Sequence, residues 1–391
     1  MSFLSPNASR QKGAPVTGRE RILTAIHRGT PDRVPTFEWF IDAGVCEALA
    51  GTPDPIVAAD RLDLDGINVR ADYRKHFTEA TTFVDEWGIH RALTGDCIPC
   101  VRRSPIADIT RHAEFVFPDP ASPERFRTLE RALRVAGDRR AVILNLRDGF
   151  SDMRDLLGYE EALMAVLEEP EHFAALLDRV VEYNLELARL AVERFGIEIV
   201  ATTDDVATAA GPLVSPQVYF DVIAPSFRKV IRGYRDLGCL VIKHSDGDVS
   251  ALADFWIESG IDCLDPIDPG AGVSFAEARA RYGDRVALKG NVDCAGVLQY
   301  GTAADVRVAV RECLEQGGHA GHILSSSNTI HRGVKPENYR AMLDALFEEG
   351  GRRMEEGGFR AKVGVPVSVP RAPLFAPRST SDTCENHKEG A

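Results

Sequence analysis

A histidine and an aspartate stand two residues apart, directly after a short apolar run at 239–243. They are His244 and Asp246, and Asp248 follows at the same spacing. Side chains alternate along a strand, so these three residues would share one face. A histidine and a carboxylate placed in this way can hold Zn²⁺ with further ligands from neighbouring strands, and the ion would act as a Lewis acid on a substrate oxygen or sulfur. The spacing also suits a histidine hydrogen-bonded to a carboxylate without any metal, so both interpretations stay open.

Two adjacent carboxylates, Asp204 and Asp205, follow another apolar run at 197–203. Neighbouring side chains point to opposite sides of a strand end, so one carboxylate would face inward and the other away. The inward one could act as a general acid or base with a raised pKa. The alternative is that one carboxylate caps a helix while the other forms a salt bridge.

An arginine, Arg147, follows the apolar run at 141–146 and could contact substrate. A guanidinium can receive a carboxylate through two parallel hydrogen bonds, which would suit an acidic substrate. Pairing with the nearby Asp148 or Asp152 is the alternative, and the sequence does not decide between them.

Amide and aromatic side chains complete the set of candidate substrate-binding residues. Asn145, Asn291 and Asn328 end or follow apolar runs, although asparagine at such places also caps helices and makes turns. Trp39 could form an aromatic wall with Trp87, while packing in the core is the default role of both.

The elements that must position these residues alternate along the chain. Eight short apolar runs occur, at 34–40, 66–70, 141–146, 197–203, 239–243, 261–264, 286–289 and 322–324. Most are followed by helical patterns, clearest at 160–167, 172–195, 216–237, 249–258, 275–282, 303–316 and 336–354. Strands that alternate with helices indicate parallel strands joined by crossovers.

Eight such units predict a single (β/α)8 TIM barrel, in which the functional side chains gather at the carboxyl ends of the strands. An open doubly wound sheet is the alternative, but no GxGxxG follows the first run, so its dinucleotide-binding form lacks the fingerprint. We expect a barrel domain over 18–360, opened by a helix at 18–28 that could close the barrel bottom.

A long, irregular insertion after the second strand, at about 73–138, should shape or cover the mouth. The segments 1–17 and 361–391 are rich in Pro, Ser and Gly without periodicity, and we expect them to be flexible tails.

Composition narrows the function further. Among 391 residues, 59 acidic side chains against 46 basic ones give a net charge of −13, which disfavours nucleic acid and anionic membranes as partners. We see no secretory signal and no stretch of about 18 apolar residues, and therefore expect a cytoplasmic protein with reduced cysteines. Cys97 and Cys100 form a lone CxxC, a weak metal signal that suits ordinary loop thiols better.

Several motifs resemble the uroporphyrinogen decarboxylase-like superfamily. They occur in the expected order over about residues 18–350: RERILTAI at 19–26 with PDRVP at 31–35, DD at 204–205 with GPLVSP at 211–216, HSDG at 244–247, LKGNVD at 288–293, ILSS at 323–326 and PEN at 336–338. The resemblance implies a TIM barrel and two main activities. One is decarboxylation of uroporphyrinogen without a cofactor; the other is methyl transfer to or from a corrinoid protein, usually with zinc.

The resemblance also favours one of these two activities over the other. The decarboxylases carry an Arg-rich segment after the first strand, whereas residues 36–44 here contain no arginine but hold Glu38 and Asp42. A substrate with many carboxylates would be repelled there. Porphyrinogen decarboxylation is therefore disfavoured, and a decarboxylase of a smaller acid, using Arg147 for the carboxylate and Asp204 or Asp205 as proton donor, is kept as the alternative.

Among the similar methyltransferases, those acting on thiols bind zinc through His-x-Cys at the fifth strand and a Cys after the eighth. His244 matches the first ligand, but Asp246 replaces the cysteine and none stands near Asn328. An oxygen-rich site is closer to the branch resembling aryl methyl ether demethylases. The resemblance thus implies a methyltransferase with zinc on His244 and Asp246, and with Glu38, Asp204 and Asp205 as further ligands or acids.

The methyl acceptor implied by this branch is a corrinoid. The spans outside the barrel cannot hold a corrinoid domain of about 100 residues or more, so the corrinoid would arrive on a partner protein. A third interpretation, a non-catalytic barrel that serves as a scaffold, is disfavoured by the many charges at the strand ends. The sequence leaves a homo-oligomer open.

Overall fold

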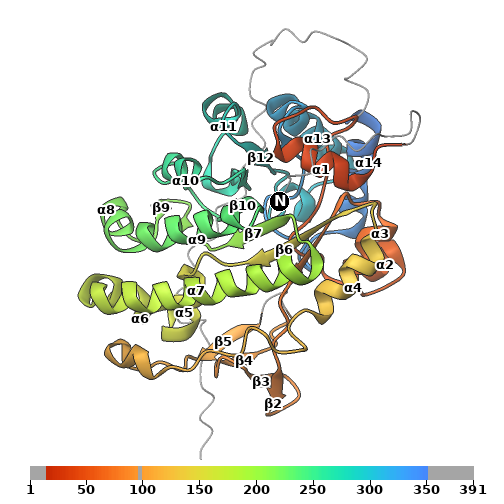
Figure 1. The fold of residues 1–391 in the computed structure, drawn as a ribbon. Coiled ribbons are helices and arrows are strands. Elements are labelled where there is room, and N and C mark those ends of the chain that lie inside the picture. Colours follow the sequence, from red (N-terminus) through yellow and green to blue (C-terminus); the bar gives the residue numbers. More distant parts are fainter. Residues whose placement is uncertain (1–14, 96–98, 351–391) are drawn as a thin grey trace, which may run out of the picture. The chain divides into compact units, whose positions relative to one another are not determined.

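The computed structural model describes residues 15–95 and 99–350 (Figure 1). Apart from residues 15–17, the predicted tails lie outside the described residues, as does Cys97; the boundaries of the barrel domain remain a prediction. Among the described residues, no helix is long and apolar enough to cross a membrane.

Seven parallel strands form the central sheet, and they neighbour one another in chain order. They are β1 (Gly66–Arg70), β6 (Ala141–Leu146), β7 (Ile199–Thr203), β10 (Leu240–His244), β11 (Cys263–Asp265), β12 (Ala287–Lys289) and β13 (His322–Ile323). Each is separated from the next by helical chain, as parallel crossovers require. The sheet is that of a TIM barrel, and the predicted fold class is confirmed.

The segment at 34–40, which the sequence predicts as the first strand, is extended chain in the structure and not a regular strand. Thr36 forms an isolated parallel bridge with Leu324, while its carbonyl accepts a hydrogen bond from the Asp65 amide at 2.8 Å. Pro35 lacks an N–H group and so cannot continue a ladder. The segment nevertheless lies between β1 and β13 and takes the place of the eighth strand.

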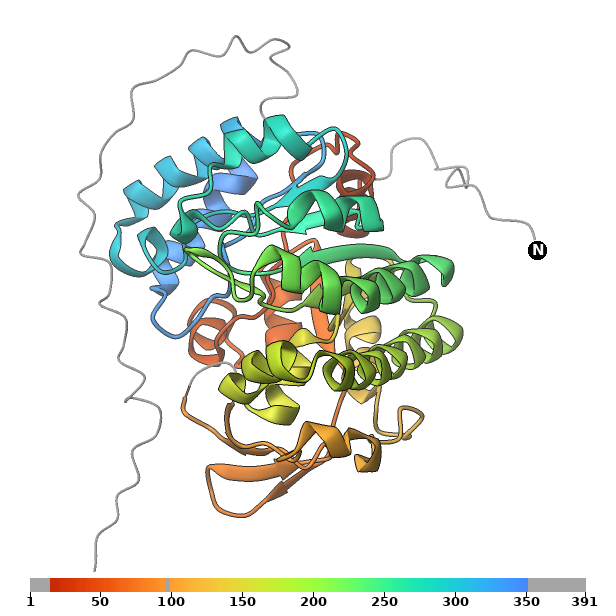
Figure 2. The same cartoon turned by 90° about the vertical axis from the view of Figure 1, so that its left-hand side faces the viewer.

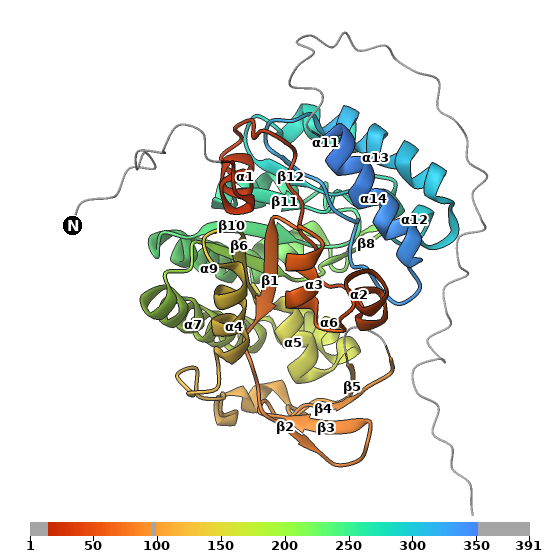
Figure 3. The same cartoon turned by 90° about the vertical axis from the view of Figure 1, so that its right-hand side faces the viewer.

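Helices follow the strands, as the alternating pattern predicts (Figures 1 and 3). They are α2 (Ala43–Ala50), α3 (Pro55–Arg61), α4 (Arg127–Ala136), α5 (Phe150–Leu157), α6 (Tyr159–Glu168), α7 (Pro170–Phe195), α9 (Ala224–Asp236), α10 (Ala253–Ser259), α11 (Phe275–Tyr282), α12 (Val297–Tyr300), α13 (Ala303–Gly317) and α14 (Pro336–Glu349). The helix predicted at 216–237 is divided into α8 (Pro216–Val218), a π-helical turn η2 (Tyr219–Ile223) and α9. Short 3-10 turns occur at η1 (Ile109–Glu114) and η3 (Pro269–Ala271).

The two faces of the strands point to different cores. Inward-facing residues pack with Ile22, Ala25 and Ile26 of α1 (Gly18–Ile26) and include Ile143, Ala201, Ile242, Cys263 and Ile323. Their neighbours Leu144, Val200, Val241, Leu264 and Leu288 belong to the core shared with the helices. The α1 amide of Arg19 donates to Arg139, which precedes β6, so α1 closes the amino-terminal end of the barrel as predicted.

The insertion after β1 is more regular than predicted. It forms a four-stranded antiparallel sheet of β2 (Lys75–Phe77), β3 (Thr82–Asp85), β4 (His90–Ala92) and β5 (Cys100–Arg103), seen below the barrel in Figure 2. Strands of three or four residues are too short for a clear period-two pattern, which is why the sequence reads as irregular. A second antiparallel pair, β8 (Ala207–Thr208) and β9 (Gly211–Pro212), follows β7.

Candidate functional site

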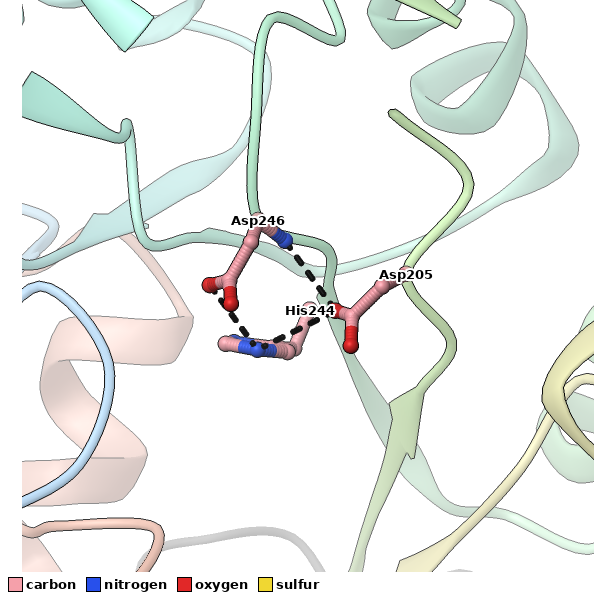
Figure 4. Close-up of side chains that lie close together, drawn as sticks. All are labelled: Asp205, His244 and Asp246. Atoms are coloured by element: carbon pink, nitrogen blue, oxygen red, sulfur yellow. Dashed lines mark hydrogen bonds and ion pairs between the residues drawn. The ribbon is translucent and has the colours of Figure 1, made fainter. Parts of the chain in front are cut away.

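The described residues bring together three potential metal ligands at the carboxyl ends of β7 and β10: Asp205, His244 and Asp246 (Figure 4). Their ligand atoms lie within 4.8 Å of one another. Nε2 of His244 is 3.4 Å from Oδ1 of Asp246 and 3.7 Å from Oδ1 of Asp205. The backbone amide of Asp246 donates to Asp205, which fixes the turn after β10.

One oxygen of this cluster is left unsatisfied. Oδ1 of Asp246 is buried and accepts no hydrogen bond within the described residues, while Oδ2 accepts one from the Asn328 amide. A buried carboxylate oxygen without a donor is costly, and a cation would satisfy it. The imidazole and carboxylate ligands found here are those that zinc accepts, so the residues fit such an ion.

A buried network sets the orientation of His244. Its Nδ1 is 2.5 Å from Oδ2 of Asp265, which also accepts from Nε1 of Trp39 at 2.5 Å. Lys289, fully buried, donates to the other oxygen of Asp265 at 2.8 Å. With Nδ1 engaged by the carboxylate, Nε2 is free to act as a ligand, as in histidines that bind metals through a carboxylate partner.

The charges of the cluster are unbalanced. Burial by itself would lower the pKa of His244, but Asp265, Asp246 and Asp205 together raise it. Burial and the nearby carboxylates Asp205 and Asp268 raise the pKa of Asp246 to about 7. Carboxylates that repel one another around one imidazole favour a bound cation.

The side chains of the adjacent aspartates point in opposite directions, as the alternation of side chains along a strand predicts. Asp205 faces the mouth and joins the cluster, whereas Asp204 points outward and is fully buried. Asp204 accepts from the amides of Phe150 and Ser151, the first residues of α5. It also lies beside Asp148, whose pKa is raised by burial and by Asp204. The geometry thus gives Asp204 a capping position, away from the mouth.

Glu38 is buried, and its hydrogen bonds go to a residue outside the three potential ligands. It accepts hydrogen bonds from the amide and the hydroxyl of Ser326, at 3.1 and 2.6 Å. Burial raises its pKa to about 7. A carboxyl with this pKa can hold a proton at neutral pH, as a general acid must. The assignment of Glu38 as an acid remains a proposal.

A cavity of about 550 Å³ lies between the carboxyl ends of β1 and β6 and the β2–β5 sheet. Asn145, Arg147 and Trp87 line it. Arg147 forms ion pairs with Asp152 at 2.9 Å and with Asp155 at 3.1 Å. Of the two aspartates considered from the sequence, Asp152 is therefore a partner of Arg147, and Asp148 instead pairs with Lys243 at 2.7 Å.

The remaining candidates for substrate contacts do not line this cavity. Trp39 lies inside the barrel with its ring edge-on to His244, at 5.3 Å between centroids. Asn291 donates to the carbonyl of Ile267, and Asn328 donates to Asp246. The structure therefore places Trp39 and Asn328 beside the potential metal ligands, and the Asn291 side chain against the backbone of the neighbouring strand end.

Three further residues of the mouth received no role in the sequence analysis: Arg70, Asp265 and Lys289. Each is the last residue of its strand and shares the inward parity of His244. The position after an apolar run is the available signal, but a single charged residue there does not reveal its partner across the barrel.

A parallel barrel with charged side chains gathered at its carboxyl mouth defines the class of TIM-barrel proteins whose functional site lies at that mouth. The family model described as uroporphyrinogen decarboxylase (URO-D) matches residues 69–348. The chain belongs to this family.

Relatives in the family differ in their activities. A uroporphyrinogen decarboxylase of Thioalkalivibrio sulfidiphilus is 42% identical over 79 residues, which is 20% of this chain and 22% of that protein. A methylated-thiol–coenzyme M methyltransferase of Methanosarcina mazei is 26% identical over 207 residues, 53% of each chain. The chain thus matches about half or less of the length of these curated relatives. A solved methyltransferase from Methanosarcina mazei has the same fold, with a TM-score of 0.69 and 18% identity over 85% of this chain and 99% of that one.

Proposed function

We propose that this protein is a methyltransferase that moves a methyl group from an aryl methyl ether to a corrinoid carried by a partner protein. The observation that carries the proposal is the cluster of Asp205, His244 and Asp246 with the unsatisfied Asp246 oxygen. The similarity to a methylated-thiol methyltransferase supports methyl transfer as the reaction class.

The three clustered residues would hold zinc, which supplies Lewis acidity toward the ether oxygen. The ligand set argues for an oxygen substrate, because a thiol substrate is better served by thiolate ligands. Asp265 holds the imidazole so that Nε2 faces the mouth, and Lys289 keeps Asp265 ionised inside the barrel. Burial would raise the pKa of Asp265, yet Lys289 and His244 hold it below the ordinary value.

The proton balance of the reaction gives a role to an acid of this chain. The acceptor's electron pair forms the new bond to the methyl group. The C–O electron pair stays on the phenol oxygen, which then takes up one proton. Glu38 can hold a proton at neutral pH, since its pKa is about 7. We assign it as the proton reservoir of the site.

The test combines metal analysis with methyl transfer. We expect about one zinc ion per purified chain and methylation of a Co(I) corrinoid protein by a methoxylated aromatic, followed by its absorption spectrum. A protein that stays active without metal would contradict the zinc assignment. The lack of any spectral change of Co(I) corrinoid with every methyl donor tried would contradict the methyltransferase.

A second candidate function is decarboxylation of a smaller carboxylic acid without a cofactor. It is favoured by the arginines of the cavity, Arg70 and Arg147, and by the similarity to uroporphyrinogen decarboxylases. Release of carbon dioxide from an added acid, in the absence of corrinoid, would distinguish it from methyl transfer.

A further inference from the structure

Arg70 is a cation of the cavity that forms no ion pair with any described residue. It is the last residue of β1, and its side chain lines the cavity beside Asn145. Among the described residues its one hydrogen bond goes to Oγ1 of Thr203, at 3.4 Å, and no carboxylate lies within 4.0 Å of its guanidinium. A guanidinium offers five N–H donors, so Arg70 has donors left for a ligand.

The other two arginines of the cavity have their charges matched. Arg147 pairs with Asp152 and Asp155, and Arg91 pairs with Asp85 at 2.7 Å and with Asp155 at 2.9 Å. Lys75 of β2 also lines the cavity, with its Nζ 5.1 Å from the centre of the Phe83 ring, so Arg70 supplies the positive charge available to a ligand at the corner between β1 and β6.

Asn145 offers an unused donor at the same corner. It lies opposite Arg70 in the register of the two strands and is 4% exposed. Its Oδ1 accepts from the hydroxyl of Thr203 at 2.8 Å, while its buried Nδ2 has no partner within the described residues. Thr203 accepts from Arg70 and donates to Asn145, so this one hydroxyl fixes which side of the amide presents its N–H groups.

We propose that Arg70 and Asn145 form a subsite for the carboxylate of an anionic aromatic substrate. The proposal rests on the proposed function and names its substrate class, a methoxylated aromatic acid. Tyr73, Phe83 and Trp87 line the same cavity and offer apolar surface to a ring. Thr203, which links the two donors, lies opposite His244 on the next strand. A substrate held at Arg70 therefore extends toward the metal ligands.

The charges around the subsite select a monoanion over a dianion. A carboxylate can accept one hydrogen bond from the guanidinium and one from the Asn145 amide. A phosphate dianion would bring more negative charge close to Asp152 and Asp155, which line the same cavity.

The test is calorimetric titration of the full-length protein with 3- and 4-methoxybenzoate, their neutral benzamides and methoxyphenyl phosphate. We expect the benzoates to bind about tenfold or more tightly than the benzamides and than the phosphate. Arg70→Gln should abolish this preference, Arg70→Lys should retain part of it, and Asn145→Ser should reduce it. Arg189→Gln, an exposed arginine of α7, is the matched control and should leave it unchanged.

Several outcomes would overturn the subsite. They are equal affinity for benzoate and benzamide, a preference that survives in folded Arg70→Gln, tighter binding of the phosphate, or no binding of any carboxylate. Circular dichroism and thermal unfolding establish that each variant is folded. Because binding needs no turnover, selective binding of benzoate without methylation of corrinoid would refute the proposed function and leave the subsite intact.

Discussion

The imidazole of His244 and the carboxylate of Asp265 lie directly opposite one another on neighbouring strands, with Nδ1 and Oδ2 2.5 Å apart. Both residues face the barrel interior, because each follows an inward-facing residue by two positions. An ionised carboxylate only accepts hydrogen bonds, so the proton of this contact belongs to the imidazole, and in the neutral imidazole the lone pair lies on Nε2. The strand register therefore prepares His244 as a ligand before any ion binds.

Removal of a ligand should remove the metal. We expect His244→Ala and Asp246→Ala to lose the bound zinc and to lower methyl transfer by about 100-fold or more, since catalytic zinc sites keep only three protein ligands. Metal analysis and the corrinoid assay measure the two effects. Asp248→Asn, on the same loop but outside the cluster, is the control, and equal losses in this variant would contradict the assignment.

The contact between Asp265 and His244 should tune the affinity for metal. Asp265→Asn is expected to weaken zinc binding by about 10–100-fold, the usual effect of removing a carboxylate partner of a ligating histidine. Competition with a chromophoric chelator measures it. Because this change also removes the partner of buried Lys289, Trp39→Phe serves as a milder variant that removes one hydrogen bond to Asp265. Unaltered zinc affinity in both variants would refute the orienting role.

Because of Asp246, zinc binding should strengthen as the pH rises, while the stability of the metal-free protein should fall. Its pKa of about 7 lies above the ordinary 3.8, so in metal-free protein the folded state binds more protons than the unfolded state between about pH 4 and 7. The free energy of unfolding of metal-free protein therefore falls as the pH rises through this window. Zinc binding needs the ionised carboxylate and strengthens over the same range.

The variant Asp246→Asn isolates this effect. The Asp246 side chain is 32% exposed, so solvent screens part of the repulsion. As the pH rises, we expect the free energy of unfolding of Asp246→Asn to fall by about 1–2 kcal/mol less than that of the unmodified protein. Urea unfolding of metal-free protein at pH 5 and pH 8 measures it. Identical pH dependence in the variant and the unmodified protein would show that Asp246 is not the titrating group.

Asp204 should act on stability more than on the site. It is fully buried, caps α5 and lies beside Asp148, so Asp204→Ala is expected to lower the free energy of unfolding by about 3–5 kcal/mol. Asp204→Asn keeps an acceptor for one amide and should cost less. Urea unfolding measures both. If Asp204→Asn were stable yet inactive with full zinc content, Asp204 would be a catalytic residue after all.

Much of the fold follows from alternation along the chain. The bounds predicted at 66–70 and 141–146 coincide with β1 and β6, and the ends of the other five barrel strands lie within two residues of the prediction. The segment at 34–40 fails as a strand because of Pro35, and the β2–β5 sheet fails to appear in the sequence because its strands are too short to show a period.

The sequence predicts those features of the site that follow from the alternation of side chains along a single strand. Parity predicts that His244 and Asp246 share a face and that Asp204 and Asp205 diverge, which matches their placement. It cannot reveal partners across the barrel, because contacts such as Asp265 with His244 depend on the register between strands. Arg70 has no motif of its own, and only the three-dimensional structure shows that it pairs with no carboxylate in the described part of the chain.

The β2–β5 sheet is a separate hydrogen-bonded unit that supplies one wall of the cavity in which we propose that the substrate binds, while the three potential metal ligands come from the strand ends of the barrel. In the proposed function the insertion would thus shape the apolar end of the substrate site, while the barrel strands carry the carboxylate subsite at Arg70 and Asn145 and the three potential metal ligands. Evolution could exchange the sequence of this insertion and change the range of substrates without altering Asp205, His244 or Asp246. For the protein engineer, residues 75–103 are the segment to diversify first.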